Sequence, residues 1–250
     1  MKVLELFSGT GSVEKVCKKL EWESVSVDKF LPADHFVDIF DFDYKQYDKN
    51  HFDIIWASPP CTAYSKLQDS WIGRMRKNKE IFTKEKMNND MLEADLLVKK
   101  SLEIINYFNP KWWFMENPQT GKLKTREVVE GLNYYDVDYC MYSDWGYKKR
   151  TRIWTNRTDF KPKLCDGSGN CGNMVMLENK KQHQKVLANG YEIVDGKKTL
   201  CNTKEKRDQF REYKKHNNQV VPSKTATGTT NKLDRYRVPE NLILDLFNEK

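Results

Sequence analysis

The sequence predicts an α/β fold, with a doubly wound, Rossmann-like sheet and helices on both of its faces. Short apolar segments alternate with helical patterns as far as about residue 158, which is typical of a parallel sheet with crossover helices. The continuous run KWWFMEN, residues 111–117, suits a central strand that is covered on both faces. A glycine turn between the first strand and the first helix favours ligand binding at that edge of the sheet.

The elements follow in order from local patterns. Short apolar runs predict further strands, at KVLELF (2–7), SVSVD (24–28) and FDIIWA (52–57), with a closing pair at 136–146 and 150–156. Helical spacing relates Val13, Val16, Cys17 and Leu20, and it predicts a helix between the first two strands. A long helix is expected from about Asn88 until Pro110 stops it, and RVPENLILDLF (237–247) is expected to form the last helix.

The character of the sequence changes after Asn156. From about residue 159 to 230 it is polar, basic and rich in glycine, with little apolar periodicity, and we expect a small, loop-rich lobe there. The expected division is a main domain at 1–158, the lobe at 159–230, and a C-terminal helix at 231–250 that packs back on the main domain.

Composition narrows the classes of partner. The 250 residues carry a formal net charge of +7, which favours an anionic partner, nucleic acid before membrane. We see neither a membrane-spanning apolar run nor a signal-peptide pattern. We expect a monomer, located in the cytoplasm either of a prokaryotic cell or of a cell infected by a virus or phage.

The cysteines give little indication of a metal. Six cysteines are scattered along the chain, and we expect reduced thiols. Cys165, Cys171, Cys201 and His183 are of the types that bind zinc. However, five residues separate Cys165 from Cys171, whereas zinc-binding pairs are typically about two to four apart. The sequence therefore favours no bound metal.

The segment LELFSGTGS (4–12) places Gly9 and Gly11 between a strand and a helix. Glycines there let backbone N–H groups approach a ligand, although an ordinary tight turn would also explain them. Asp28 ends the next expected strand, about 20 residues later, where an acid commonly binds ribose hydroxyls. Asp38 could contact an adenine amino group. The alternatives are an exposed acid for Asp28 and a loop cap for Asp38.

Cys61 follows two prolines at the end of an expected strand. The prolines fix the backbone, and ligands bind at such strand ends, so the thiol is presented rather than packed; a small buried thiol is the alternative. Glu116 ends another central strand, where it could donate a proton or simply cap a turn. Arg150 and Arg152 alternate along a strand, so both point to one side, in a site or on a solvated edge.

Together, these segments resemble those of the cytosine-C5 DNA methyltransferases, which use S-adenosylmethionine. The resemblance rests on LELFSGTGS as the cofactor loop, SPPCTAYS (58–65) as the nucleophile loop, ENP (116–118) as the base-binding acid and RTR (150–152) as the arginine pair, in the family's order. It covers residues 1 to about 156 and the last helix. The chain departs from the family's usual residues at Thr62, Tyr64, Pro118 and Lys148, which leaves the reacting groups in place.

The resemblance implies double-stranded DNA as substrate and S-adenosylmethionine as cofactor. Cys61 would add to C6 of a flipped-out cytosine, Glu116 would bind the N3 and amino edge, and Arg152, next to Arg150, would hold O2. The residues implied in cofactor binding are Phe7, Ser8, Gly9, Thr10, Gly11, Asp28, Asp38 and Pro59. Those implied in DNA binding are Ser65, Arg74, Arg76 and Lys77.

The lobe at 159–230 would be the target-recognition region, with the basic stretch 161–215 selecting the target sequence. Two other functions stay open. One branch of the family acts on tRNA, and the net charge does not distinguish DNA from RNA, because both present phosphates. The second is a catalytically silent binding module of the same fold. Cys61 argues against that module, since binding alone requires no thiol.

Overall fold

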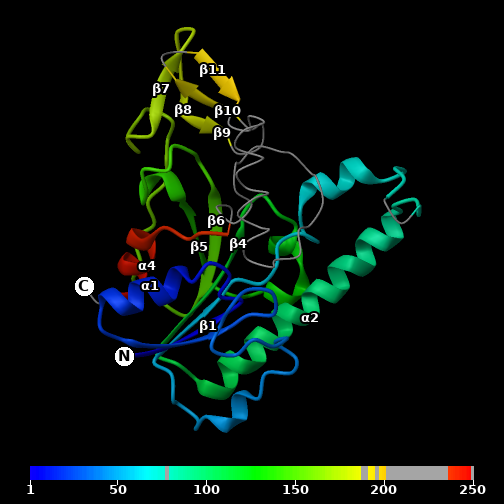
Figure 1. Cartoon of the computed structure of the whole chain (residues 1–250), viewed down its shortest axis with the longest axis vertical. Helices are drawn as coiled ribbons and strands as arrows, with labels where there is room; N and C mark the ends of the chain where they lie inside the picture. The colour runs from blue at the N-terminus through cyan, green and yellow to red at the C-terminus, as the bar shows by residue number, and fades with distance from the viewer. Residues whose placement is uncertain (77–78, 187–190, 195–196, 201–235, 249–250) are drawn as a thin grey trace. The chain divides into compact units, whose positions relative to one another are not determined.

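The computed structural model describes residues 1–76, 79–186, 191–194, 197–200 and 236–248 (Figure 1). The chain forms two compact units. The first contains Met1–Val137, Arg150–Pro162 and Ile243–Lys250, and the second contains Asp138–Lys149 and Lys163–Leu242. The division at residues 158 and 230 stays a prediction. Among the described helices, none combines the length and the apolar character needed to cross a membrane.

A six-stranded sheet forms the centre of the first unit, in the order β2-β1-β3-β4-β6-β5. Its strands are β1 (Lys2–Leu6), β2 (Glu23–Val27), β3 (Ile54–Ala57), β4 (Trp112–Pro118), β5 (Tyr134–Asp138) and β6 (Arg150–Thr155). The first four strands are mutually parallel where they pair, and β6 runs antiparallel to β4. The predicted doubly wound α/β class is therefore confirmed.

Helices cover both faces of this sheet (Figure 1). The long helix α2 (Lys84–Phe108) contributes Met91, Val98 and Ile105 to a core that contains Leu4 and Leu6 of β1. Helix α1 (Ser12–Lys19) buries Val13, Val16 and Cys17. On the face of Trp56 and Phe114, the ring of Phe247 from α4 (Glu240–Phe247) lies 5.9 Å from that of Phe114. The sequence alternation within each strand sends side chains to both layers.

Helix α2 begins four residues earlier than its apolar spacing predicts. The side chain of Thr83 accepts a hydrogen bond from the backbone N–H of Lys86 at 3.0 Å, and this cap starts the helix at Lys84. At the other end, Asn109 adopts a left-handed conformation just before Pro110, so the stop lies where the proline predicts it. Local hydrogen bonding, rather than apolar periodicity, thus sets the start.

The strand expected at 136–146 is shorter and starts earlier. After β5 the chain forms the 3-10 helix η5 (Tyr139–Met141). The buried carboxylate of Asp138, the last residue of β5, accepts from the backbone N–H of Cys165 at 2.9 Å. The other 3-10 helices are η1 (Tyr44–Gln46), η2 (Lys66–Trp71), η3 (Leu123–Thr125) and η4 (Glu127–Val129).

The described part of the second unit is built from short strands and turns. Strands β7 (Met174–Leu177) and β8 (Lys180–His183) form an antiparallel hairpin. A separate three-stranded sheet has the order β11-β10-β9, from Lys197–Leu200, Tyr191–Val194 and Lys185–Val186. A loop without regular structure joins the first unit to β7, as its glycine-rich sequence predicts.

Candidate active site

The four parallel strands end at one level of the sheet. The register pairs Leu6 of β1 with Val27 of β2 and with Ala57 of β3, and pairs Ala57 with Met115 of β4. The residues that come next are Phe7, Asp28, Ser58 and Glu116. The fold therefore gathers the glycine loop, the expected ribose acid, the nucleophile loop and the expected base-binding acid at the carboxyl edge, where ligands bind in such sheets.

The glycine loop turns sharply from β1 into α1. Gly9 and Gly11 have φ angles of 55° and 65°, which cost glycine little because it lacks a Cβ. Phe7 also has a positive φ, 58°, a strained conformation of the kind that occurs at ligand sites. The N–H of Ser8 donates to the carbonyl of Val27 at 3.1 Å, so the loop, which includes Thr10, is held against β2.

Glu5 fixes the start of helix α1. Its carboxylate accepts hydrogen bonds from the backbone N–H groups of Val13, at 3.2 Å, and Glu14, at 3.1 Å, which have no partner within the helix. Burial raises the pKa of Glu5 to about 8, although these two hydrogen bonds act in the opposite direction. Sequence reasoning missed this residue; the signal was an acid in an otherwise apolar strand.

Asp28 joins the glycine loop to the segment after β2. One carboxylate oxygen accepts from the N–H of Gly9 at 2.9 Å, and the other accepts from the N–H groups of Phe30, at 2.7 Å, and Leu31, at 2.8 Å. Asp38 forms an ion pair of 2.6 Å with Lys29. The pKa of Asp38 is lowered, mainly by this hydrogen bond with Lys29. Both acids therefore hold the edge of the expected cofactor site in shape.

The nucleophile loop is anchored to the neighbouring strand. The side-chain amide of Asn117 donates to the carbonyl of Pro59 at 2.9 Å, and this hydrogen bond is buried. Cys61 is partly exposed, and its carbonyl accepts from the N–H of Tyr64 at 3.2 Å. The loop therefore keeps the thiol near the surface of the sheet edge rather than in the core. Asn117 is a positioning residue that the sequence did not identify.

Tyr64 ties the same loop to helix α2. Its ring is fully buried, and its hydroxyl donates to the carboxylate of Asp95 at 2.9 Å. Arg126 binds that carboxylate as well, with Nε at 3.0 Å from Oδ2. This network gives the hydroxyl of Tyr64 a hydrogen-bond partner, at a position where the family that the sequence resembles more often has phenylalanine.

Glu116 presents a buried polar atom at the sheet edge. Its side chain is 8% exposed, and Oε2 has no hydrogen-bond partner among the residues that the structure describes. Thr151 Oγ1 is also buried and also has no hydrogen-bond partner among the described residues. Because Pro118 pairs with Thr151, and Glu116 with Ile153, both orphan oxygens belong to one face of the β4–β6 pair. Buried polar groups normally have partners, so these two oxygens mark the part of the sheet edge to consider for a ligand.

The arginine pair lies on the other face of the same two strands. Arg152 is opposite Asn117, and Arg150 shares its side of β6, as the alternation predicts. The guanidinium of Arg152 donates to both oxygens of Asp136, at 2.8 and 3.0 Å. The backbone register therefore places Arg152 and Glu116 on alternate faces at the end of the sheet, rather than directly side by side.

The loop after Cys61 carries the expected DNA-binding residues. Arg74 is exposed, and the side chain of Ser65 caps η2 by accepting from the N–H of Leu67 at 3.3 Å. Arg76 is half-buried, with its guanidinium 3.7 Å from the ring centroid of Phe82. Lys77 lies outside the described residues.

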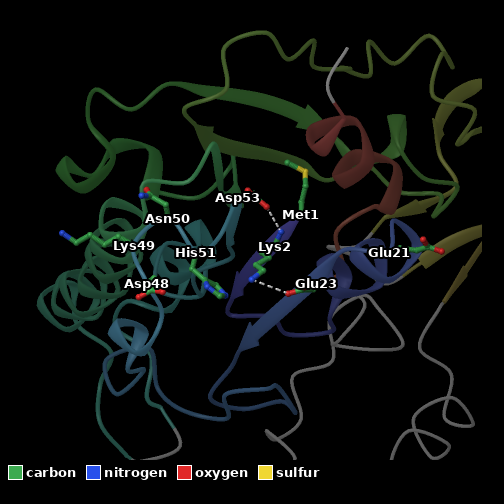
Figure 2. Close-up of a pocket in the computed structure, with 9 residues that line it drawn as sticks. All are labelled: Met1, Lys2, Glu21, Glu23, Asp48, Lys49, Asn50, His51 and Asp53. Carbon is green, nitrogen blue, oxygen red and sulfur yellow. Dashed lines mark hydrogen bonds and ion pairs between the residues drawn. The ribbon is translucent and has the colours of Figure 1, made fainter.

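A polar hollow lies at the opposite, amino edge of the sheet, where β1 and β2 begin (Figure 2). Lys2 is bound there by two acids: its backbone N–H donates to Asp53 at 2.7 Å, and its ammonium lies 3.8 Å from Glu23. None of the predicted site residues lines this hollow. We therefore place the candidate site at the carboxyl edge, where the predicted site residues lie.

Comparison with known proteins decides the family. A curated relative from Frog virus 3 (isolate Goorha), named "Probable DNA (cytosine-5)-methyltransferase", is 38% identical over 251 residues and covers 99% of both chains. The chain belongs to the cytosine-C5 DNA methyltransferase family. No family model matches this methyltransferase.

Two solved methyltransferases have a low similarity to this cytosine-C5 methyltransferase. EhMeth of Entamoeba histolytica is 16% identical, with a TM-score of 0.42 over 66% of this chain and 55% of its own. Dnmt2 of S. pombe is 16% identical, with a TM-score of 0.33 over 66% and 51%. The methyltransferase thus spans about half the length of these two structures, and similarity at this level bears on no residue of the site.

Proposed function

We propose that the protein transfers a methyl group from S-adenosylmethionine to C5 of a cytosine flipped out of duplex DNA, through a covalent bond between Cys61 and C6. The observation that carries the proposal is the common sheet edge: the glycine loop, Cys61 and Glu116 follow neighbouring strands in register. The relative at 38% identity, named as a DNA (cytosine-5)-methyltransferase, supports DNA as the substrate.

The residues of this edge suit S-adenosylmethionine. A Cβ at Gly9 would meet only a backbone oxygen at 3.8 Å, so the turn at Gly9 leaves room for a ligand, whereas a Cβ at Gly11 would meet the carboxylate of Glu14 at 3.0 Å. Asp28 lies beside this loop for the ribose hydroxyls. Phe30 and Phe40, which flank the acids, are 78% and 50% exposed, and such rings can pack on an adenine. When bound, the cofactor supplies an electrophilic methyl group.

Cys61 makes C5 of cytosine nucleophilic. Cytosine C5 reacts poorly by itself, but a thiolate that bonds to C6 pushes the electrons of the C5–C6 double bond onto C5. C5 then bonds to the methyl carbon, and the bond from that carbon to sulfur breaks. A base removes the C5 proton, the C5–C6 double bond forms again, and the bond from C6 to Cys61 breaks. The thiol is thus regenerated in each cycle.

Glu116 and Arg152 stabilise the charge that develops on the ring. The buried Oε2 of Glu116 would bind the N3 and amino edge and hold a proton there as the thiolate adds. Arg152 keeps N–H donors beyond the two that Asp136 uses, and these would approach O2, with Arg150 on the same side of β6. Asn117 would help to position the thiol loop through its hydrogen bond to Pro59.

The loop at 65–82 would contact the duplex around the flipped-out cytosine. It exposes Arg74 together with apolar side chains, among them Leu67, Trp71, Met75 and Ile81. Arginine suits phosphate contacts, and apolar side chains can insert where a base has left the stack. Flipping costs a few kcal/mol, which such contacts offset.

Duplex DNA with 5-fluorocytosine at the target tests the mechanism. Fluorine cannot leave as a proton does, so a denaturation-resistant complex should form, and only when S-adenosylmethionine is present. Cys61→Ser should abolish the complex, because an alcohol is far less ionised than a thiol, while DNA binding remains. Trapping on fluorinated tRNA alone would support the RNA alternative. If neither substrate is trapped and no methyl is transferred, a silent binding module is the better account.

A further inference from the structure

Three thiols and one imidazole converge in the second unit. They come from η5 (Cys140), from the glycine-rich loop (Cys165 and Cys171) and from the end of β8 (His183). Their four potential ligand atoms all lie within 4.8 Å of one another. Nε2 of His183 is 3.6 Å from Sγ of Cys165 and 3.6 Å from Sγ of Cys171. The spacing of these residues in the sequence did not predict that they would meet, so we consider what their side chains could bind together.

The distances fit a tetrahedral metal site. Bonds of about 2.3 Å to sulfur and about 2.0–2.1 Å to nitrogen, at tetrahedral angles, place a ligand sulfur and nitrogen about 3.6 Å apart. Both measured S···N distances have that value. A disulfide would instead need two sulfurs about 2.05 Å apart, and all three cysteines are free.

The second unit builds a rigid frame around these ligands. The buried amide of Asn173 donates to the carbonyls of Cys140, at 2.8 Å, and Cys171, at 2.9 Å. Its oxygen accepts from the N–H of Gly146 at 2.8 Å. One side chain therefore fixes the backbones of two ligand residues, as supporting hydrogen bonds do in metal sites.

The charge of the cluster also suits a cation. Cys140 and Cys165 are 1% and 3% exposed, and three thiolates with one divalent ion carry a single negative charge. Lys148 lies beside them, with Nζ 2.9 Å from the carbonyl oxygen of Cys165 and 3.4 Å from the carboxylate of Asp138.

We propose that Cys140, Cys165, Cys171 and His183 bind one structural zinc ion. Four protein ligands leave no open position, which is the arrangement of structural rather than catalytic zinc. The site replaces the sequence-based expectation of no metal. Cys140 takes the place considered for Cys201, which lies outside the described residues. The ion would join residues 138–149 to 163–183 within the second unit, independently of the proposed methyl transfer.

Metal content of the full-length protein tests the site. Protein purified without added metal or chelator should contain about one zinc ion per chain. Cys171→Ser and His183→Ala should each lose most of it. Cys61→Ser is the matched control, because Cys61 is partly exposed like Cys171, and it should keep its zinc. Loss of zinc in the control, or unchanged zinc in Cys171→Ser, would overturn the proposal.

A measurement on the wild-type chain covers the case in which these variants do not fold. X-ray absorption at the zinc edge should show three sulfur neighbours at about 2.3 Å and one nitrogen at about 2.0–2.1 Å. Replacement by Co(II) should give the visible absorption of tetrahedral cobalt bound to thiolates. An all-oxygen or six-coordinate environment, a folded protein that binds neither metal, or a disulfide within the cluster found by mass spectrometry would contradict the site.

Discussion

Asp136 binds Arg152 through both carboxylate oxygens, with Nε at 2.8 Å and a terminal nitrogen at 3.0 Å. The guanidinium also lies over the ring of Tyr134, 3.5 Å from its centroid. The hydrogen bond that Arg152 donates to Asp136 is the main reason why the pKa of Arg152 is raised. Asp136 and Tyr134 together fix the plane of the guanidinium. Its remaining N–H donors are therefore oriented before any base enters the site.

Weakening the interaction between Asp136 and Arg152 should slow methyl transfer, while the affinity for S-adenosylmethionine stays the same. Asp136→Asn keeps the shape but loses the charge, and we expect kcat to fall about 10-fold. Arg152→Lys should cost about 100-fold or more, because lysine lacks the planar donors. Single-turnover rates measure the effect, and calorimetry with S-adenosylmethionine is the control. If Asp136→Asn leaves the rate unchanged, Asp136 does not position Arg152 for catalysis.

Glu5 predicts a pH dependence of stability. Its pKa rises from 4.5 to about 8 on folding, so between these pH values the folded protein keeps a proton that the unfolded chain has lost. The free energy of unfolding should therefore fall as pH rises from about 4.5 to 8 and level off above that range.

Glu5→Gln should remove this slope, because the amide does not titrate. Urea unfolding of both proteins at several pH values between 5 and 8.5 measures the difference. Glu23→Gln, at an exposed position of β2, is the control and should keep the wild-type slope. Parallel curves for wild type and Glu5→Gln would show that Glu5 is already ionised in the folded protein.

Asp28 should affect the cofactor through three hydrogen bonds at once. Asp28→Ala leaves the N–H groups of Gly9, Phe30 and Leu31 without their acceptor. At about 1–3 kcal/mol for such a loss, the Kd for S-adenosylmethionine should rise about 10- to 100-fold. Asp28→Asn, which keeps one oxygen, should lie between. Calorimetry measures both, with the exposed Asp48→Ala at the amino edge as control; equal affinities for all four proteins would move the ribose contact elsewhere.

Arg74 and Arg76 should differ in their effect on DNA binding. Arg74 is exposed, so Arg74→Ala should weaken binding to all duplexes and reduce the salt dependence by about one phosphate contact. Arg76 packs on Phe82 and lies 3.3 Å from the side-chain oxygen of Gln68. Arg76→Ala should therefore make the loop more sensitive to proteolysis. Salt titrations of binding and limited proteolysis separate the two, and an unchanged salt slope for Arg74→Ala would exclude its phosphate contact.

The sequence alone predicted the class of sheet, the strand ends that carry the site and the family. These features are local: apolar runs of strand length, a glycine turn, and prolines before a cysteine are encoded within about ten neighbouring residues. The comparison at 38% identity confirmed the family. The roles assigned to Cys61, Glu116 and the arginines stay predictions.

Only the tertiary structure decided which side chains meet. The register places Arg152 beside Asn117 instead of Glu116, and a shift of one residue would have reversed this. Likewise, Cys140 joins Cys165, Cys171 and His183 although it stands far before them in the chain. Such contacts depend on how distant segments pack, and packing is fixed by the whole core rather than by any local pattern. The sequence therefore predicted that the reactive residues follow the strand ends, whereas only the folded structure showed which side chains contact them.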